Sequence, residues 1–321
     1  MNEYPGAHYQ MSVGGLALLV IFLMANAVFV FRVTRVFQYV CLGQGTLGMD
    51  RLPGRIRDVL VKGFGQTLVL RTAAGWGHAF IFWGFFVLTF GTTEGLISSI
   101  LHGFSFAFLG PIYPIMNTLQ DFFAVLVLGA LGVAAYRRLI IRPKRLEASL
   151  DHTIDALIIL SLIALLICAC FGMMIIEPRP GALVFSKSLR AAILGTASHA
   201  GRAQYPFAFA AFEWTHNLVV LGFLMYIPFS KHLHIVTSLP NLFFREEHAP
   251  GRIDKVDLEN ENADHFGIVR ISDFSRKELL DLTACTECGR CQSQCPAWHT
   301  GKPLSPKLLV MDLREAMLSG A

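Results

Sequence analysis

Four cysteines near the end of the sequence have the spacing of ligands to an iron-sulfur cluster. Cys285, Cys288, Cys291 and Cys295 follow the pattern C-x2-C-x2-C-x3-C, and a proline comes directly after the last. Thiolates at this spacing bind a [4Fe-4S] cluster. Zinc sites normally use two separated cysteine pairs or added histidines, and steps of three residues do not favour an unstrained disulfide framework. The run therefore predicts an iron-sulfur centre.

The fourth cysteine leaves the ligand set open. In two-cluster ferredoxins the fourth cysteine of such a run binds the other cluster, and this sequence holds a single run. Either the chain belongs to a longer polypeptide, or a partner supplies the remaining ligands, or Cys295 completes one cluster in an unusual way. The first two alternatives are favoured. Gly289, inside the run, is expected to permit the tight backbone turn that the ligands require.

Histidines on two apolar segments are candidate haem ligands. His216 and His234 are separated by five whole turns of a continuous helix, or about 27 Å, so their rings would share one face. Pro228 lies between them and could bend that helix. His78 lies in another apolar segment at a depth close to that of His234, and the two are predicted to bind an inner haem b. Intramembrane histidines can also serve only as hydrogen-bonding partners of neighbouring helices.

His216 has no equally good partner at its own depth, because Leu88 stands where a second ligand would be convenient. Three acids are expected nearby in depth: Glu94, Asp121 and Glu213. Ionisable residues inside a membrane are costly and usually functional. The alternatives are a second haem with an unusual ligand, so that the chain carries one haem b or two, or a quinone site in which these acids handle protons.

The composition places these residues in a membrane. The sequence is 54% hydrophobic and only 16% charged, against about 25% charged residues in a soluble domain. A net charge of +4 is too small to suggest a nucleic-acid partner. A membrane-spanning helix needs about 20 mainly apolar residues. The sequence meets this condition in five windows: 12–31, 73–97, 115–136, 153–176 and 210–230.

Basic residues predict the orientation of the chain. They are frequent after the first and third windows, and these loops are expected on the cytoplasmic side. The loop between the fourth and fifth windows also holds basic residues and weakens the pattern. The prediction is a multi-pass protein of the cytoplasmic membrane, with the N-terminus outside and the cysteine run in the cytoplasm.

The fold is predicted to be all-α, a five-helix transmembrane bundle followed by a small cytoplasmic ferredoxin-like helical iron-sulfur segment. Residues 1–240 would form the haem-bearing membrane domain, 241–270 an acidic linker and 271–321 the cluster segment. Residues 245–265 contain seven acidic and three basic side chains. Ser275 is a candidate N-cap for a short helix that leads the chain to the first cysteine of the run.

Residues 70–245 resemble the haem-bearing gamma subunit of respiratory nitrate reductase. The resemblance implies that His216 and His234 each ligate one haem b and that His78 is a ligand on the second helix. Leu88 occupies the place of that family's other ligand on this helix, so the outer haem does not carry over. The likeness is carried by Gly222, Pro228 and Phe229 and by the run Ser230-Lys231-His232-Leu233-His234-Ile235.

The segment 281–307, DLTACTECGRCQSQCPAWHTGKPLSPK, resembles membrane-bound iron-sulfur oxidoreductases related to heterodisulfide reductase. Within these it is most similar to electron-transferring-flavoprotein:menaquinone oxidoreductase. Members of this family continue with a second cluster run and with cysteine-rich domains of the CCG type. The resemblance therefore implies that a C-terminal half, or a CCG-domain subunit, completes the protein.

These features predict a quinone-linked membrane oxidoreductase, or an electron-transfer subunit of one. Electrons would pass from a cytoplasmic donor to the cluster, then to haem b and to menaquinone as the substrate. By resemblance the donor is electron-transferring flavoprotein, although another soluble donor fits the residues equally well. The alternatives are a membrane subunit of a heterodisulfide-reductase-like complex and a membrane anchor without redox chemistry. A transporter is disfavoured because the sequence has no repeat symmetry.

Overall fold

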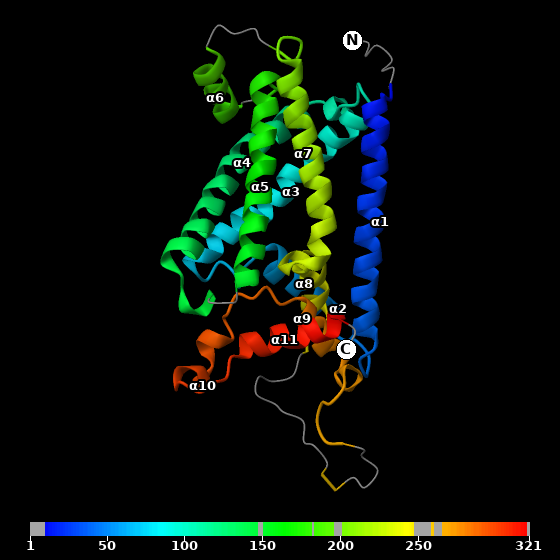
Figure 1. The fold of residues 1–321 in the computed structure, drawn as a ribbon, viewed down its shortest axis with the longest axis vertical. Coiled ribbons are helices and arrows are strands. Elements are labelled where there is room, and N and C mark those ends of the chain that lie inside the picture. Colours follow the sequence, from blue (N-terminus) through cyan, green and yellow to red (C-terminus); the bar gives the residue numbers. More distant parts are fainter. Residues whose placement is uncertain are drawn as a thin grey trace. The chain divides into compact units, whose positions relative to one another are not determined.

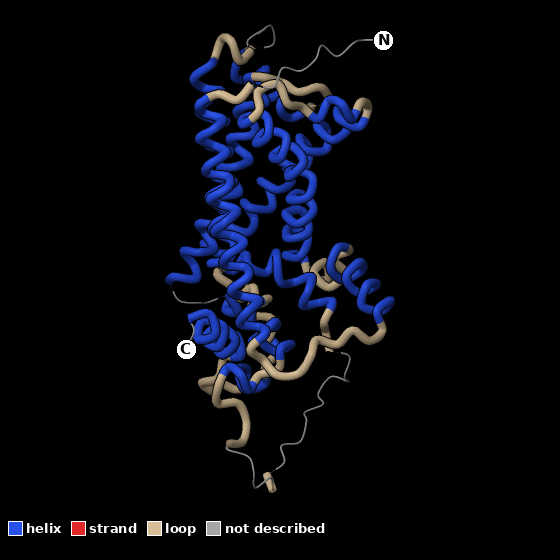
Figure 2. The backbone as a smooth tube through the Cα atoms, turned by 90° about the vertical axis from the view of Figure 1, so that its right-hand side faces the viewer, coloured by secondary structure: helices blue, strands red, loops and turns tan. Residues whose placement is uncertain are grey.

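The computed structural model describes residues 10–146, 150–181, 183–195, 201–246, 258–259 and 265–319. Over these ranges the secondary structure is helical, and the β-type pairing consists of two isolated bridges rather than strands (Figure 2). This agrees with the predicted all-α class, while the ferredoxin-like character of the last segment stays a prediction. The long helices are α1 (Val13–Cys41), α3 (Ala73–Ile100), α4 (Ile112–Tyr136), α5 (Leu150–Ile176) and α7 (Pro206–Tyr226) (Figure 1).

Shorter elements connect and follow these helices. The α-helices among them are α2 (Leu52–Asp58), α6 (Val184–Leu194), α8 (His234–Phe243), α9 (Arg276–Thr283), α10 (Pro296–His299) and α11 (Pro306–Ser319). The π-helical and 3-10 turns are η1 (Val59–Phe64), η2 (Phe106–Leu109), η3 (Arg137–Ile141), η4 (Lys144–Leu146), η5 (Ile227–Phe229), η6 (Lys231–Leu233), η7 (Ile271–Asp273) and η8 (Gln292–Gln294).

Five helices are long and apolar enough to cross a membrane, which confirms the five predicted spans. They contain between 24 and 30 residues each, more than the number of about 20 that a span requires. Large apolar side chains on them are exposed, including Phe207, which is 90% exposed. Such surface is unfavourable in water and favourable in lipid. The spans are Val13–Cys41, Ala73–Ile100, Ile112–Ile141, His152–Ile176 and Pro206–Phe229.

The chain divides into two compact units. The first, here called the bundle unit, comprises Met1–Val28, Val69–Arg142 and Ala148–Tyr226. The second, here called the cluster unit, comprises Phe29–Leu68, Pro143–Glu147 and Ile227–Ala321. This division cuts the chain at places other than the predicted domain boundaries, because it groups connecting segments with the cysteine run. The predicted boundaries stay a prediction, and much of the predicted linker lies outside the described residues.

Within the bundle unit, α3 packs along α4, and α5 packs along α7 (Figure 1). Small residues permit this close approach, as is usual between membrane helices. A Cβ atom added at Gly84 of α3 would overlap the side chain of Val127 on α4. A Cβ added at Gly172 of α5 would lie 2.6 Å from the ring of Phe212 on α7. The four helices therefore place polar residues of each span close to those of its neighbours.

The cluster unit has a separate apolar core, to which α1, α9 and α11 contribute the buried residues Val40, Leu279, Leu280, Leu282 and Met317. The predicted cap of α9 is confirmed, because the Ser275 hydroxyl accepts from the Glu278 N–H and the Glu278 carboxylate accepts from the Ser275 N–H. This reciprocal arrangement fixes the start of a short helix. Thr237 of α8 donates to the Thr283 carbonyl at 3.1 Å and so joins α8 to the end of α9.

One buried arginine organises the loop that follows α1. Arg55 is 3% exposed, and its guanidinium donates to the carbonyls of Phe243 and Arg245 at 2.8 and 2.9 Å. It also donates to the Asp50 carboxylate at 2.9 Å. Carbonyls at the end of a helix have no partner within it. Arg55 therefore satisfies the end of α8 from a distant part of the chain.

The prediction of one continuous helix from His216 to His234 is wrong. Helix α7 ends at Tyr226, two 3-10 turns follow, and α8 begins at His234. Pro228 explains the break, because proline has no N–H and its ring clashes with the preceding turn of a helix. The Ser230 hydroxyl accepts from the His232 N–H at 3.1 Å and starts the next turn. The two histidines therefore do not share one helical face.

Candidate functional site

The loop from Cys285 to Cys295 begins directly after α9 and makes two left-handed turns. Glu287 has φ 58° and Gly289 has φ 68°. The predicted tight turn at Gly289 is therefore present, and the left-handed conformation at Glu287 is unusual for a residue with a side chain. Cys285 and Cys295 are half-buried, whereas Cys288 and Cys291 are exposed.

The sulfur positions do not by themselves define a metal centre. Over the described part of the chain, no three His, Cys, Asp or Glu side chains form a group that could hold a metal ion. The assignment of the cluster therefore rests on the spacing and chemistry of the four thiols and on the backbone turns between them. On these grounds the residues fit a [4Fe-4S] cluster, because soft thiolate ligands select iron-sulfur clusters. Burial raises the pKa of the Cys285 thiol, and metal binding would have to displace that proton.

The loop from Cys285 to Cys295, here called the cluster loop, contacts the connection that contains η4. These contacts lie at Cys288 and Gly289. The Arg145 guanidinium donates to the Cys288 carbonyl at 3.3 Å. A Cβ atom added at Gly289 would overlap the Arg145 carbonyl, so this approach requires glycine. Lys307 of α11, only 2% exposed, donates to the same Arg145 carbonyl at 3.3 Å. Backbone and cationic groups thus surround the loop on this side.

A second group of charges holds the loop at Glu287. Its carboxylate accepts from Lys231 at 2.9 Å and from Arg314 at 2.8 Å. Arg314 also donates to the Cys285 carbonyl at 2.9 Å. Burial opposes ionisation of Glu287, but the charges of Lys231 and Arg314 outweigh it, so the pKa of this carboxyl lies below its ordinary value. An ionised Glu287 therefore lies between two cations, beside the first cysteine of the run.

His234, the predicted ligand of the inner haem, is the first residue of α8. Its Nδ1 lies 2.8 Å from the carbonyl oxygen of Lys231, and a histidine that donates there leaves Nε2 for a metal. Burial lowers the pKa of His234, which favours the neutral imidazole that ligation requires. The ring of His232 packs edge-on against that of His234, with 5.4 Å between the centroids.

His78, the predicted partner of His234, lies near the start of α3 and is exposed. The cap of α3 is Thr72, whose hydroxyl accepts from the Gly75 N–H at 3.2 Å. His78 belongs to the bundle unit and His234 to the cluster unit. Their pairing as ligands of one haem therefore stays a prediction.

His216 lies in the interior of the bundle unit, 3% exposed. Its Nδ1 is 3.3 Å from the Leu166 carbonyl of α5, and its ring lines a cavity of about 10 Å³ together with Leu88 and Gln120. A cavity of this size holds about one water molecule. Leu88 lines this cavity and offers no ligand atom, so a second haem with an unusual ligand stays a prediction.

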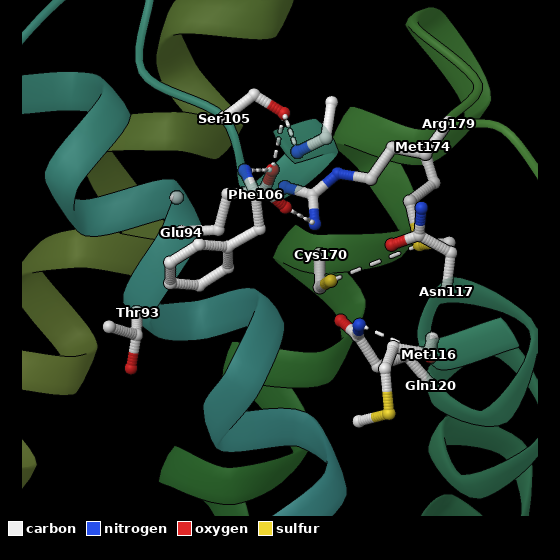
Figure 3. A network of polar contacts seen from close by, with 12 residues as sticks. Thr93, Glu94, Ser105, Phe106, Met116, Asn117, Gln120, Cys170, Met174 and Arg179 are labelled. Carbon is white, nitrogen blue, oxygen red and sulfur yellow. Dashed lines mark hydrogen bonds and ion pairs between the residues drawn. The ribbon is translucent and has the colours of Figure 1, made fainter. Parts of the chain in front are cut away.

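The three predicted acids are satisfied by three different sets of partners. Glu94, which is 3% exposed, accepts from the Ser105 hydroxyl and the Phe106 N–H, both at 2.8 Å (Figure 3). It also forms an ion pair with Arg179 at 3.1 Å. Asn117, Gln120, Cys170 and Met174 lie in the same region of the bundle (Figure 3). Glu94 therefore combines a hydroxyl, a backbone N–H and a cation as its partners.

Asp121 and Glu213 lie in other contexts. Asp121 accepts from the N–H groups of Phe185 and Ser186 at 2.8 and 3.0 Å, and so caps the first turn of α6. Glu213 accepts from the Ser99 hydroxyl at 2.9 Å and pairs with Arg202 at 3.5 Å. Because the acids belong to separate networks, a shared quinone or proton site made of all three stays a prediction.

Residue spacing did not identify the cations that surround the predicted ligands. Arg145, Lys231 and Arg314 reach the cluster loop from separate parts of the sequence, and Lys231 lies 56 residues from Glu287. A charged residue inside the cysteine run was a usable signal, because a buried acid requires a cationic partner. The sequence position of that partner could not be deduced from the run itself.

Comparison with curated proteins shows that the chain is similar to iron-sulfur and quinone-linked oxidoreductases. It is 35% identical over 302 residues to "Probable iron-sulfur-binding oxidoreductase FadF" of Bacillus subtilis, covering 93% of this chain and 42% of that protein. It is 30% identical over 322 residues to "EtfAB:quinone oxidoreductase" of Syntrophomonas wolfei, covering 94% of this chain and 43% of that protein. The chain thus spans less than half the length of these relatives.

A third relative matches a shorter stretch. This is "Probable membrane-anchored ferredoxin" of Chromohalobacter salexigens, 41% identical over 66 residues, or 21% of this chain and 10% of that protein. No family model matches the chain, and no solved structure matches it significantly. Five spans and these relatives identify a membrane protein. The resemblance predicted from segment 281–307 is confirmed, and the chain is homologous to membrane-associated iron-sulfur oxidoreductases of the flavoprotein:quinone type.

Proposed function

We propose that this chain carries electrons from a soluble flavoprotein to a membrane quinone through one [4Fe-4S] cluster and one haem b. The observation that carries the proposal is that one compact unit contains both the four-cysteine loop and His234. The relative named as an oxidoreductase between electron-transferring flavoprotein and quinone supports this choice of donor and acceptor. Menaquinone is the proposed quinone, by the resemblance of segment 281–307.

The chain's own residues have distinct parts in this function. When bound, the cluster and the haem supply one-electron transfer, which cysteine and histidine side chains alone do not provide. Cys285, Cys288 and Cys291 would bind the cluster, with Cys295 as the fourth thiolate or as a ligand to a further centre. The Lys231 carbonyl lies 2.8 Å from Nδ1 of His234, so Nε2 would be the ligating atom. His78 is the second ligand that the sequence predicts for this haem.

Quinone reduction consumes two protons as well as two electrons, so the site must contain proton-handling groups. Glu94 is the strongest of the proposed candidates, because it is buried and accepts from the Ser105 hydroxyl and the Phe106 N–H (Figure 3). It also forms an ion pair with Arg179 at 3.1 Å. Glu213 and Asp121 remain candidates, although Asp121 already caps α6.

The proposed orientation follows from the basic loops. We propose that the N-terminus faces outside and that the cysteine loop faces the cytoplasm, where a soluble donor can reach the exposed Cys288 and Cys291. Impermeant thiol labelling of intact cells is expected to leave the cysteine run unmodified, and to modify it after lysis and removal of the cluster with a chelator and oxidant. Equal labelling before lysis would contradict this orientation.

Two substitutions test the order of the carriers. His78→Ala should abolish the haem b absorbance while leaving the paramagnetic signal of the cluster intact. Cys288→Ala should remove the cluster signal without removing haem, and should stop haem reduction by reduced flavoprotein. Retained haem in the first variant would refute the ligand assignment, and retained haem reduction in the second would refute the order.

A second candidate function follows from the length of the relatives. Because the chain spans less than half of them, further cysteine-rich domains of the CCG type, on the same polypeptide or on a partner, would allow dithiol and disulfide chemistry of the heterodisulfide-reductase kind. A membrane anchor without redox activity is the remaining alternative. The difference spectrum of the reduced and oxidised purified protein separates the anchor from both, because only a redox protein gives a haem b band.

A further inference from the structure

Lys231 contacts both the proposed haem ligand His234 and the loop that carries the proposed cluster ligands. Its carbonyl oxygen lies 2.8 Å from Nδ1 of His234, the proposed haem ligand. Its ammonium group lies 2.9 Å from the carboxylate of Glu287, which stands between Cys285 and Cys288. A single residue thus connects the first turn before α8 to the loop that carries the cluster ligands, within one compact unit.

The connection is buried and ionic. Lys231 is 9% exposed and Glu287 is 7% exposed, and the side chain of Arg314 on the same carboxylate is 14% exposed. Burying charges is costly, and an apolar contact of similar volume is often as stable. A salt bridge is therefore a poor choice if the only task is to hold the loop. Its geometry and its charge are the properties that an apolar contact would lack.

The charges beside the loop do not cancel. Two cations, Lys231 and Arg314, face one carboxylate, so the group has a net positive charge next to Cys285 and Cys288. The potential of an iron-sulfur cluster depends on nearby charge and on hydrogen bonds. When the cluster gains an electron from the donor, a net positive neighbourhood favours the reduced form. In the proposed order, one electron would be taken from the donor and one passed on to the haem, so the electron count balances.

We propose that Lys231 is a positioning residue for electron transfer, which fixes the cluster loop relative to the haem ligand His234 and raises the potential of the cluster. This inference rests on the proposed function, because it requires both centres. It adds a role for a residue that binds neither centre directly. Arg314 supports the same arrangement through its bonds to Glu287 and to the Cys285 carbonyl.

The test uses the full chain with both cofactors and separates charge from position. Lys231→Met removes the cation and the connection, Lys231→Arg keeps both, and Glu287→Gln removes the anion. In the double variant Lys231→Met with Glu287→Gln, one cation and one anion are lost, so the net charge stays that of the unaltered protein while the connection is absent. Lys277→Met is the matched control, because Lys277 bonds Asn241 and Asp281 in the same unit.

Three measurements are made on each variant: haem and iron content, the midpoint potential of the cluster by paramagnetic resonance, and the rate of haem reduction in a single turnover. Lys231→Met should lower the potential, Glu287→Gln should raise it, and the double variant should restore it. Because a misplacement of about 1 Å can slow a reaction by orders of magnitude, haem reduction should slow about tenfold or more in Lys231→Met and in the double variant. Lys231→Arg and Lys277→Met should match the unaltered protein.

The outcomes distinguish this inference from the proposed function. Absence of haem or cluster from the unaltered protein overturns both. Normal cofactor content with unchanged haem reduction in the double variant overturns the positioning role alone. An unchanged potential in Glu287→Gln overturns the charge effect. If Lys231→Met does not assemble its cluster, the shift in Glu287→Gln and the rescue by Lys231→Arg decide, and failure of either refutes the proposal.

Discussion

The bundle unit and the cluster unit both bury a carboxylate, but they neutralise it differently. Glu94 in the bundle unit faces one cation, Arg179, and completes its bonding with a hydroxyl and a backbone N–H. Glu287 in the cluster unit faces two cations, Lys231 and Arg314. The first environment balances the charge of the acid. The second exceeds it and leaves a net positive charge beside the cysteine run.

The difference shows how one residue type serves two purposes. In an apolar interior an unpaired charge is very costly, so balance is the condition for burying Glu94 among lipid-facing helices. Near a centre that accepts electrons, an excess of positive charge has a use that stability alone does not explain. The same comparison extends to the backbone, because the cluster loop contains left-handed residues while the helices around Glu94 are regular.

Replacing Glu94 should have the largest effect on stability. Glu94→Ala leaves Arg179 without this carboxylate inside the bundle unit, and breaking a buried pair costs about 3 kcal/mol or more. The free energy of unfolding in detergent measures this loss. Glu94→Gln should cost less, because its amide oxygen can still accept from Ser105. Thr93→Ala, on the exposed neighbouring face, is the matched control and should change stability by less than about 0.5 kcal/mol. If Glu94→Ala lowered the free energy of unfolding by less than about 0.5 kcal/mol, the partners of Glu94 would not be needed to bury it, and the comparison with Glu287 would fail.

Replacing Gly289 tests the strained backbone of the cluster loop. Gly289→Ala requires a left-handed alanine, which costs about 1–2 kcal/mol, and its Cβ would also overlap the Arg145 carbonyl. We expect lower iron content in the purified protein and faster loss of the cluster to a chelator. Gly301→Ala is the control, since Gly301 has φ 75° but no atom within 4 Å of an added Cβ. If both variants lost iron equally, backbone strain would explain the whole effect. The overlap of an added Cβ with the Arg145 carbonyl would then have no role.

Replacing Asp121 tests whether an acid in the bundle unit serves structure alone. Asp121→Ala removes the acceptor for the first N–H groups of α6, and loss of such a cap costs about 1 kcal/mol. Asp121→Asn should recover most of this stability, because an amide oxygen also caps a helix. Quinone reduction should follow the stability of the two variants. A loss of turnover in Asp121→Asn without a loss of stability would instead assign the residue a part in proton transfer.

The smallest effect concerns Asp58, a buried acid at the end of α2 in the cluster unit. A hydrogen bond from Lys62 at 2.8 Å holds the pKa of Asp58 below its ordinary value of 3.8, against the opposing effect of burial, and Arg245 adds to the lowering. Because the pKa is lowered in the folded state, the stability it provides is present above about pH 3.8 and is lost as the pH falls through the folded value. Carboxyl NMR should show this low midpoint, and Lys62→Met should move it upward. A midpoint unaffected by Lys62→Met would contradict the assigned cause.

Much of the fold could be predicted from the sequence because its causes are local. Runs of apolar residues determine the five spans, and the Ser275 and Glu278 pair determines the start of α9. The turn at Gly289 was predictable because cysteines three residues apart require a tight backbone. The break after α7 was underestimated, because Pro228 ends the helix where a bend had been expected, and Ser230 then starts a new turn.

The charged contacts were not predictable, because they depend on partners far apart in the sequence. Lys231 and Glu287 meet only when the segment before α8 packs against the chain after α9. The partners of Glu94 are similar, since Ser105 and Arg179 come from different connections of the bundle unit. Hydropathy and spacing identify which buried charges need an explanation. They do not identify the residue that neutralises each one.

Arg55 belongs to one of the basic loops from which the topology was predicted, and it also has a structural role. Its guanidinium donates to the carbonyl of Phe243, the last residue of α8, and to the carbonyl of Arg245 just after it. It is therefore not available to interact with lipid headgroups. These hydrogen bonds join the loop after α1 to the end of α8. A movement that separates this loop from the end of α8 would have to release the two hydrogen bonds from Arg55 to Phe243 and Arg245.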